Sequence, residues 1–309
     1  MTTEASSARV EVPSSPFVHT LAGAISGVVA ASLTQPLEVI KTRMQAERWV
    51  KNRRPRYGGL YSSFQRILRE EGPCGLFVGL GPSTLALVPA LSSFFTIYSS
   101  MKGWLSPEYA AEELQFTLTC AASAGAAWSF TSLLTNPLWL IRTRAITRIL
   151  DESKSIAGVA HGTAQPSVGN ILREILREGG YRGLYRGTLI AMAGFPAASV
   201  QFALYENLKS LTNAQGVHPV FNVGFASLVS SFLSQIMCFP LEVLRIRVQS
   251  GLDGSQVRII HLTRRMLNRE GLSSFYRGLG PSMLRTVPNT VVALVSYEFL
   301  LAFMERAFS

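Results

Sequence analysis

Three nine-residue segments of the chain are near copies of one another, and each places charged side chains at fixed distances after a proline. They are residues 35–43 (QPLEVIKTR), 136–144 (NPLWLIRTR) and 239–247 (FPLEVLRIR). The second and fifth residues after each proline lie three apart, so on a helix they share one face. Acids and bases at this spacing, without a nucleophile or a metal-ligand set beside them, favour ion pairs. We therefore expect these positions, Glu38, Lys41, Trp139, Arg142, Glu242 and Arg245, to lie around one closing ring.

The three prolines recur at nearly equal distances along the chain. Pro36, Pro137 and Pro240 are 101 and 103 residues apart, and one third of 309 residues is 103. Proline removes a backbone hydrogen bond and kinks a helix, so three kinked helices can converge at one end of a bundle. A Glu-Gly pair also recurs in every copy, at residues 71–72, 178–179 and 270–271. The repeats are expected at residues 17–105, 113–211 and 219–307 of a single domain, 1–309, with a flexible tail at 1–16.

The composition is that of a basic membrane protein. The chain is 48% hydrophobic and only 16% charged, with a mean hydropathy of +0.24, and it has 29 Lys and Arg against 19 Asp and Glu. A soluble domain usually carries about a quarter charged residues. The apolar content must be buried in a core or in lipid, which argues against a disordered protein and against a typical nucleic-acid binder.

Charged residues are absent from long stretches of the sequence. Five uncharged windows span residues 20–37, 72–101, 114–141, 187–205 and 210–241, and a sixth, 278–304, is interrupted only by Arg285 and Glu298. A membrane-spanning helix needs about 20 mostly apolar residues. Each window can supply one span if a few charges are allowed at its ends, so six transmembrane helices are predicted. The windows are rich in Gly, Ala, Ser and Thr, which indicates close helix contacts and a bundle that faces a polar interior cavity.

The basic residues are concentrated between alternate pairs of windows. The segments 41–71, 142–186 and 242–277 hold 24 of the 29 Lys and Arg. If the helices alternate in direction, these segments all lie on one side of the membrane, as the positive-inside rule predicts for an even number of spans. Both termini are then expected on the opposite side.

The triplicated proline motif with its later Glu-Gly block resembles the mitochondrial carrier family over nearly the whole chain. The resemblance implies an all-α membrane protein. It has six transmembrane helices in three pseudo-threefold repeats, each with a short amphipathic surface helix, around a central cavity. It also implies a monomer in the mitochondrial inner membrane, with a peroxisomal or plastid membrane as the alternative, and bilayer lipid as a partner, with anionic lipid at the repeat junctions.

The same resemblance implies a gate at the basic side, which we call the basic-side gate. Its residues are Glu38, Lys41, Arg142, Glu242, Arg245, Gln45 and Gln249. The acid of one repeat is expected to pair with a base of another, Glu38 with Arg142 and Glu242 with Lys41. Trp139 replaces the acid of the second repeat and so leaves Arg245 without its usual carboxylate. Gln45 and Gln249 match the position of a glutamine brace, and Ile146 departs from it.

A second gate, called here the opposite gate, is implied at the other side of the membrane by an aromatic-acid-x-x-base pattern. Residues 205–209 (YENLK) match it fully, 98–102 (YSSMK) lack the acid, and 297–301 (YEFLL) lack the base. Its residues are Lys102, Glu206, Lys209 and Glu298. This gate has few charges, and two gates of modest strength suit a protein that cycles between two states.

Substrate is expected midway between the gates, where polar groups inside a membrane tend to be functional. The resemblance places the substrate contacts at Arg285, Asn289, Ala86, Ala193, Gly194, Gln235 and Trp139. Arg285 is the strongest of these signals, because it is the only basic residue between Arg277 and Arg306. A guanidinium can hold a phosphate or carboxylate through two hydrogen bonds. The alternative is that Arg285 is a structural partner for a neighbouring acid.

The Pro-Leu-Trp of the second repeat indicates one branch of the family. It resembles the carriers of nicotinamide and flavin dinucleotides, folate and pyrimidine nucleotides. Residues 86–89 (ALVP) and 285–288 (RTVP) favour NAD+, whereas 288–290 (PNT) resemble the pyrimidine nucleotide carriers, and FAD or folate stay as alternatives. Trp139 can stack on a base or flavin, or it can close the gate with apolar surface.

Two other classes of protein are alternatives to a transporter: an enzyme and a channel. The four histidines have no partners at ligand spacing, and neither a phosphate-binding loop ending in Lys-Ser/Thr nor a nucleophile elbow is present, which argues against an enzyme. No metal, cofactor, catalytic residue or nucleic-acid partner is expected. The prediction is a transporter that exchanges (antiport) or imports a nucleotide, and an ion-leak or channel-like membrane protein is the alternative from another class.

Overall fold

The computed structural model describes residues 16–48, 55–105, 113–150, 167–193, 204, 219–254 and 258–308, and every regular element in them is helical. The long helices are α1 (Pro16–Ala46), α3 (Leu80–Leu105), α4 (Glu113–Thr147), α9 (Pro219–Ser250) and α11 (Leu279–Phe308). The shorter α-helices are α2 (Leu60–Glu70), α6 (Val168–Gly183), α7 (Thr188–Met192) and α10 (Ile259–Glu270). Three 3-10 helices complete the set: η1 (Pro73–Phe77), η2 (Arg148–Leu150) and η4 (Leu272–Tyr276).

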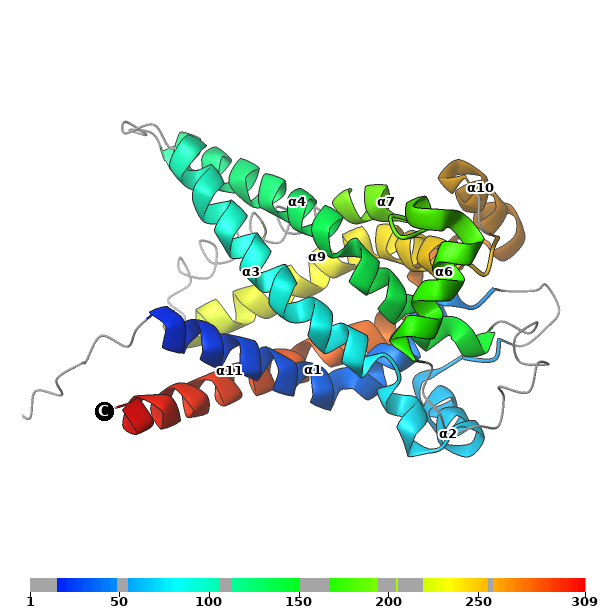
Figure 1. The fold of residues 1–309 in the computed structure, drawn as a ribbon, viewed down its shortest axis with the longest axis horizontal. Helices are drawn as coiled ribbons and strands as arrows, with labels where there is room; N and C mark the ends of the chain where they lie inside the picture. Colours follow the sequence, from blue (N-terminus) through cyan, green and yellow to red (C-terminus); the bar gives the residue numbers. More distant parts are fainter. Residues whose placement is uncertain are drawn as a thin grey trace, which may run out of the picture.

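The long helices run along the length of the molecule, and the short surface helices gather at one end (Figure 1). The helix α1 packs against α11, and α3 packs against α4, so neighbouring repeats meet along long helix pairs. The surface helices α2, α6 and α10 lie at the end where the proline motifs are, and the C-terminus lies at the other end (Figure 1). This arrangement fits the predicted unit of a helix, a surface helix and a second helix.

Four of the described helical segments are long and apolar enough to cross a membrane. They are Ala22–Ala46, Pro73–Met101, Ala226–Ser250 and Leu272–Met304. The helix α4 has 35 residues but is built largely from Ala, Ser and Thr and is not among the four. Of the span predicted at residues 187–205, the described residues are 187–193, which include α7, and 204.

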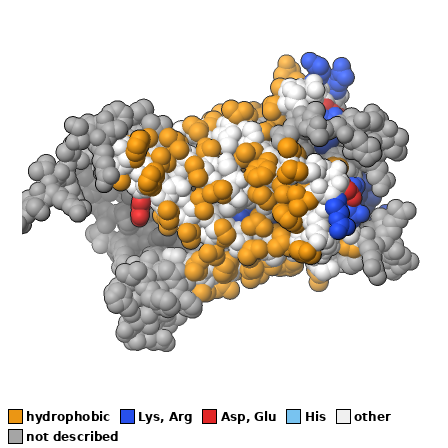
Figure 2. Space-filling model, turned by 90° about the horizontal axis from the view of Figure 1, so that it is seen from below, with side chains coloured by type: hydrophobic (Ala, Val, Ile, Leu, Met, Phe, Trp, Pro, Cys, Tyr) orange, Lys and Arg blue, Asp and Glu red, His pale blue; other side chains and the backbone are white. Residues whose placement is uncertain are grey.

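The outer surface has the pattern of a membrane protein. Hydrophobic side chains cover the middle of the molecule in Figure 2, and Lys and Arg side chains gather at the end that carries the surface helices. Several large apolar side chains of α11, among them Leu294, Phe299 and Phe303, are exposed. A contiguous apolar surface of this extent is unfavourable in water and favourable against lipid.

Three apolar clusters fix the basic end of the bundle. One joins Ile40 of α1 to Ile67 of α2, a second joins Leu140 of α4 to Ile171 of α6, and a third is centred on α9 and α10. The first cluster also takes Ile146 from the second repeat. Each surface helix is thus tied to the motif end of its own long helix, and the clusters also join adjacent repeats. This packing holds the three motif segments close enough for their charges to meet.

Glycine permits the closest approach between repeats. Gly278, just before α11, has a φ of +85°, and a Cβ there would lie 3.1 Å from the backbone oxygen of Lys41. Only glycine adopts this conformation without strain. The start of α11 can therefore pack directly on the gate segment of α1.

Candidate gate and substrate site

Two ion pairs link α1 to α4 and α9 at the basic-side gate. The Nη2 atom of Arg142 lies 2.6 Å from Oε1 of Glu38, and Nζ of Lys41 lies 2.6 Å from Oε1 of Glu242. These are the two pairs that the family pattern leads one to expect. Together the two ion pairs join all three motif segments.

Arg142 has two further contacts. Its Nε donates to Oγ of Ser83 at 2.7 Å, and its guanidinium carbon lies 5.2 Å from the centroid of the Trp139 ring. A cation over an aromatic face is attracted by the ring quadrupole. Trp139 therefore contributes to the closed gate by contacting the very arginine that pairs with Glu38.

Arg285 also contacts the gate. Its Nη1 lies 3.0 Å from Oε2 of Glu38, so this carboxylate sits between Arg142 and Arg285. The interpretation of Arg285 as a partner for a neighbouring acid thus agrees with the geometry. The side chain still keeps 27% of its surface exposed, and its Nε has no hydrogen-bond partner among the described residues. Arg285 has donors left for a ligand.

Arg245 has no acid to pair with. Among the described residues it makes no ion pair or hydrogen bond, and its buried Nε has no acceptor. The charges that act on it most are Glu242, which attracts it, and Arg142, which repels it. Because Trp139 stands where an acid is expected, the described residues hold no third pair of the ring.

The two glutamines at the brace position differ in their contacts. Gln249 accepts a hydrogen bond from Oγ1 of Thr143 at 3.2 Å and donates to Oδ1 of Asn136 at 3.3 Å. Both polar atoms of the Gln45 amide are buried without a partner among the described residues. Ile146, at the same position of the second repeat, is part of an apolar cluster instead.

The remaining predicted substrate contacts are scattered around the site. Asn289 accepts a hydrogen bond from Oγ1 of Thr34 at 3.2 Å, and Gln235 donates to Oγ1 of Thr286 at 3.4 Å. Ala86 is fully buried, whereas Ala193, at the end of α7, is exposed. Gly194 lies outside the described residues.

Most of the opposite gate also lies outside the described residues. Glu206 and Lys209 fall in this part of the chain, and so does the side chain of Lys102. Glu298 is exposed on α11.

The second base of each proline motif has a role that our sequence reasoning missed. Arg247 holds Glu270 through two hydrogen bonds, of 3.0 and 2.6 Å, and its Nε donates to the backbone oxygen of Gln45 in the first repeat at 2.8 Å. The same arrangement recurs in the other two copies, as Arg43 with Glu71 and Arg144 with Glu178. These arginines tie each surface helix to its own repeat and to the next. The signal was in the sequence, because the second base and the Glu-Gly pair recur in all three copies.

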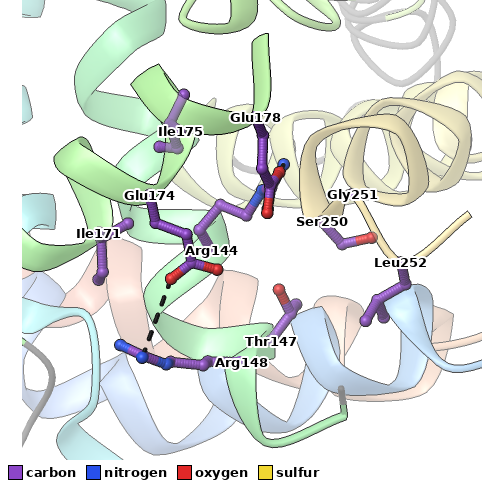
Figure 3. Close-up of a pocket in the computed structure, with 10 residues that line it drawn as sticks. All are labelled: Arg144, Thr147, Arg148, Ile171, Glu174, Ile175, Glu178, Ser250, Gly251 and Leu252. Carbon is purple, nitrogen blue, oxygen red and sulfur yellow. Dashed lines mark hydrogen bonds and ion pairs between the residues drawn. The ribbon is translucent and has the colours of Figure 1, made fainter. Parts of the chain in front are cut away.

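A cleft lies beside one of these arginines, between α4, α6 and the segment after α9 (Figure 3). Its charged side chains are already paired. Arg144 contacts Glu178 at 2.9 Å, and Arg148 lies 3.9 Å from Glu174. The four charged side chains that line the cleft thus form two ion pairs with one another.

Comparisons with known proteins agree with this geometry. The family profile described as mitochondrial carrier protein matches three times, at residues 12–109, 113–215 and 217–308. Nicotinamide adenine dinucleotide transporter 2, mitochondrial, of Arabidopsis thaliana is 32% identical over 304 positions, which cover 92% of this chain and 79% of that protein. Solute carrier family 25 member 33 of Mus musculus is 31% identical over 323 positions, covering 94% and 97%.

A yeast protein is similar to the same extent. Mitochondrial nicotinamide adenine dinucleotide transporter 1 of Saccharomyces cerevisiae is 30% identical over 296 positions, which cover 93% of this chain and 77% of that protein. Since the family profile recurs in each of the three units whose motif ends meet at the basic-side gate, and covers nearly the whole sequence, this chain belongs to the mitochondrial carrier family.

Proposed function

We propose that this protein is an alternating-access transporter that exchanges or imports a nucleotide or nucleotide-type cofactor, with NAD+ as the favoured substrate. Two of the similar proteins are named as nicotinamide adenine dinucleotide transporters. A transporter, rather than an enzyme, also fits a site built from ion pairs and amides. Its place is the inner membrane of the mitochondrion or, as the name of a chloroplastic relative suggests, of a plastid.

One observation on this chain's own residues supports the proposal most strongly. Arg285 brings a guanidinium to the gate from the second turn of α11; 27% of its side chain is exposed, and its buried Nε has no hydrogen-bond partner among the described residues. A cation at such a depth is costly unless it serves a partner. Phosphate oxygens are strong acceptors for a guanidinium, so a nucleotide phosphate is a suitable partner.

The geometry supports a simple way for substrate to act on the gate. Glu38 is held by Arg142 through one oxygen and by Arg285 through the other. An anion that binds Arg285 competes with Glu38 for it, so it weakens one of the contacts that hold α11 to α1. Substrate entering from the side opposite the closed gate would thereby favour opening of the basic side. A ligand can shift such an equilibrium only by its difference in affinity for the two states.

The proposed surroundings follow from the same account. The protein acts as a monomer in the bilayer, contacts lipid through its apolar belt, and takes an anionic small molecule and no nucleic acid.

A thermal-shift screen of the detergent-purified protein tests the substrate class. NAD+ is expected to raise the apparent melting temperature more than nucleosides that lack phosphate, because a ligand that binds only the folded state stabilises it by RT ln(1 + [L]/Kd). At a concentration of about 100 times Kd this amounts to roughly 2.7 kcal/mol. A shift with pyrimidine nucleotides alone would replace NAD+ as the substrate, and no shift with any nucleotide, flavin or folate would contradict the proposal.

A further inference from the structure

The basic-side gate and its neighbour Arg285 hold more positive than negative side chains. The cations are Lys41, Arg142, Arg245 and Arg285, and the anions are Glu38 and Glu242. The surplus is therefore two positive charges. All six residues lie in helical segments that the fold places within the bundle, where unbalanced charge is costly and tends to be functional.

The contacts show which cations are in surplus. Arg142 and Lys41 each have a carboxylate oxygen at 2.6 Å. Arg285 reaches only the second oxygen of Glu38, at 3.0 Å, and that oxygen accepts no hydrogen bond among the described residues. Arg245 has neither an ion pair nor a hydrogen bond in this part of the chain.

A second, independent observation singles out the same two among these four cations. The Nε atoms of Arg245 and Arg285 are both buried and lack an acceptor among the described residues. Buried polar groups are nearly always hydrogen-bonded. A buried donor without an acceptor therefore needs an explanation, such as an absent ligand. Here the surplus charge and the unused donors belong to the same two guanidinium groups.

The surplus has a clear origin in the sequence. The first and third motifs have Glu38 and Glu242 two residues after proline, and the second has Trp139. The Trp139 ring contacts Arg142 at 5.2 Å and brings no negative charge. Glu242, the acid that acts on Arg245, is already engaged by Lys41. No described acid is left over for Arg245.

We propose that Arg245 and Arg285 together bind two adjacent phosphate groups, and that this pair makes the protein select diphosphates over monophosphates. A diphosphate carries two neighbouring anionic groups, so it can supply acceptors to both guanidinium groups and offset both surplus charges. A monophosphate can satisfy only one of them. The inference deepens the proposed function and rests on it, since it specifies which part of a dinucleotide is recognised and by which second residue.

The test uses inorganic pyrophosphate and inorganic phosphate as probes, with the full-length protein in detergent. Apparent melting temperature is followed against the concentration of each probe. The wild-type protein is expected to bind pyrophosphate at least about tenfold more tightly than phosphate. Arg245→Gln is expected to remove this preference by weakening pyrophosphate at least tenfold, while phosphate changes little because Arg285 is intact.

A second variant tests the role of Arg245 without replacing Arg245 itself. Trp139→Asp supplies the missing carboxylate, which can pair with Arg245 and so compete with a phosphate. It is expected to lower the preference for pyrophosphate in the same way, which keeps the proposal testable if Arg245→Gln does not fold. Arg264→Gln is the matched control, because Arg264 is exposed on the surface helix α10 and lies outside the gate motifs, and the substitution also removes one arginine.

The outcomes separate this inference from the proposed function. Equal binding of pyrophosphate and phosphate by the wild-type protein, or an unchanged preference in both the Arg245→Gln and the Trp139→Asp protein, overturns the inference. If NAD+ binds while the preference survives in both variants, the proposed function stands and the inference fails. If the preference depends on Arg245 but no nucleotide binds, the inference about diphosphate binding stands and the proposed function fails.

Discussion

Replacing Arg285 with Ala should reduce nucleotide uptake into liposomes by roughly 100-fold or more, while the protein still inserts into the membrane. The guanidinium belongs to the second turn of α11, inside an apolar candidate span, and its buried Nε has no hydrogen-bond partner among the described residues. Hydrogen bonds to charged groups contribute about 1.5–3 kcal/mol each, and 1.4 kcal/mol is a tenfold change in affinity. The loss of a two-point contact to phosphate therefore gives an effect of this size.

Arg285→Lys is the matched control for that experiment. Lysine keeps the positive charge but cannot form the planar pair of hydrogen bonds to phosphate. Uptake in this variant is expected to lie between that of the wild type and that of Arg285→Ala. Wild-type uptake in the alanine protein would remove Arg285 from the substrate site and leave it as a structural partner of Glu38.

Replacing Glu38 with Gln should weaken the closed gate more than any other single change to its acids. This carboxylate is 9% exposed and contacts two cations, Arg142 at 2.6 Å and Arg285 at 3.0 Å. Removing one partner of a buried ion pair typically costs about 3–5 kcal/mol, because the other charge stays behind unpaired. The variant is expected to melt at a lower temperature and to lose the preference for the state closed at the basic side.

Glu242→Gln provides the comparison for this prediction. Glu242 contacts one cation, Lys41, and keeps 33% of its side chain exposed, so solvent compensates part of the loss. Its melting temperature should fall less than that of Glu38→Gln. A larger fall at Glu242, or no fall at Glu38, would mean that the shared contact of Arg142 and Arg285 does not stabilise this state.

The sequence predicted the parts of the site that repeat. The resemblance to the family, which the three copies of the motif carry, leads us to expect the pairs of Glu38 with Arg142 and of Lys41 with Glu242, and both are present. The link from Arg247 to Glu270 also repeats, and the recurrence of the second base and of the Glu-Gly pair in all three copies is the signal that predicts it.

Features that occur in one repeat were harder to predict. The contact between Arg285 and Glu38 depends on how closely α11 packs against α1. The spacing of residues along the sequence does not specify this packing. The sequence therefore left two roles open for Arg285. The unpaired amide of Gln45 is a similar case, because the brace expected there depends on a partner in another repeat. The expected residues of the opposite gate stay predictions, since most of them lie outside the described part of the chain.

The measurement that tests the central claim most directly is counterflow in liposomes that contain the purified protein. Uptake of external labelled NAD+ should saturate with concentration, and internal unlabelled NAD+ should accelerate it roughly tenfold, because a gate that opens at one side at a time returns faster with substrate bound. Uptake that rises linearly with concentration and ignores the internal nucleotide would contradict the account and indicate a channel instead.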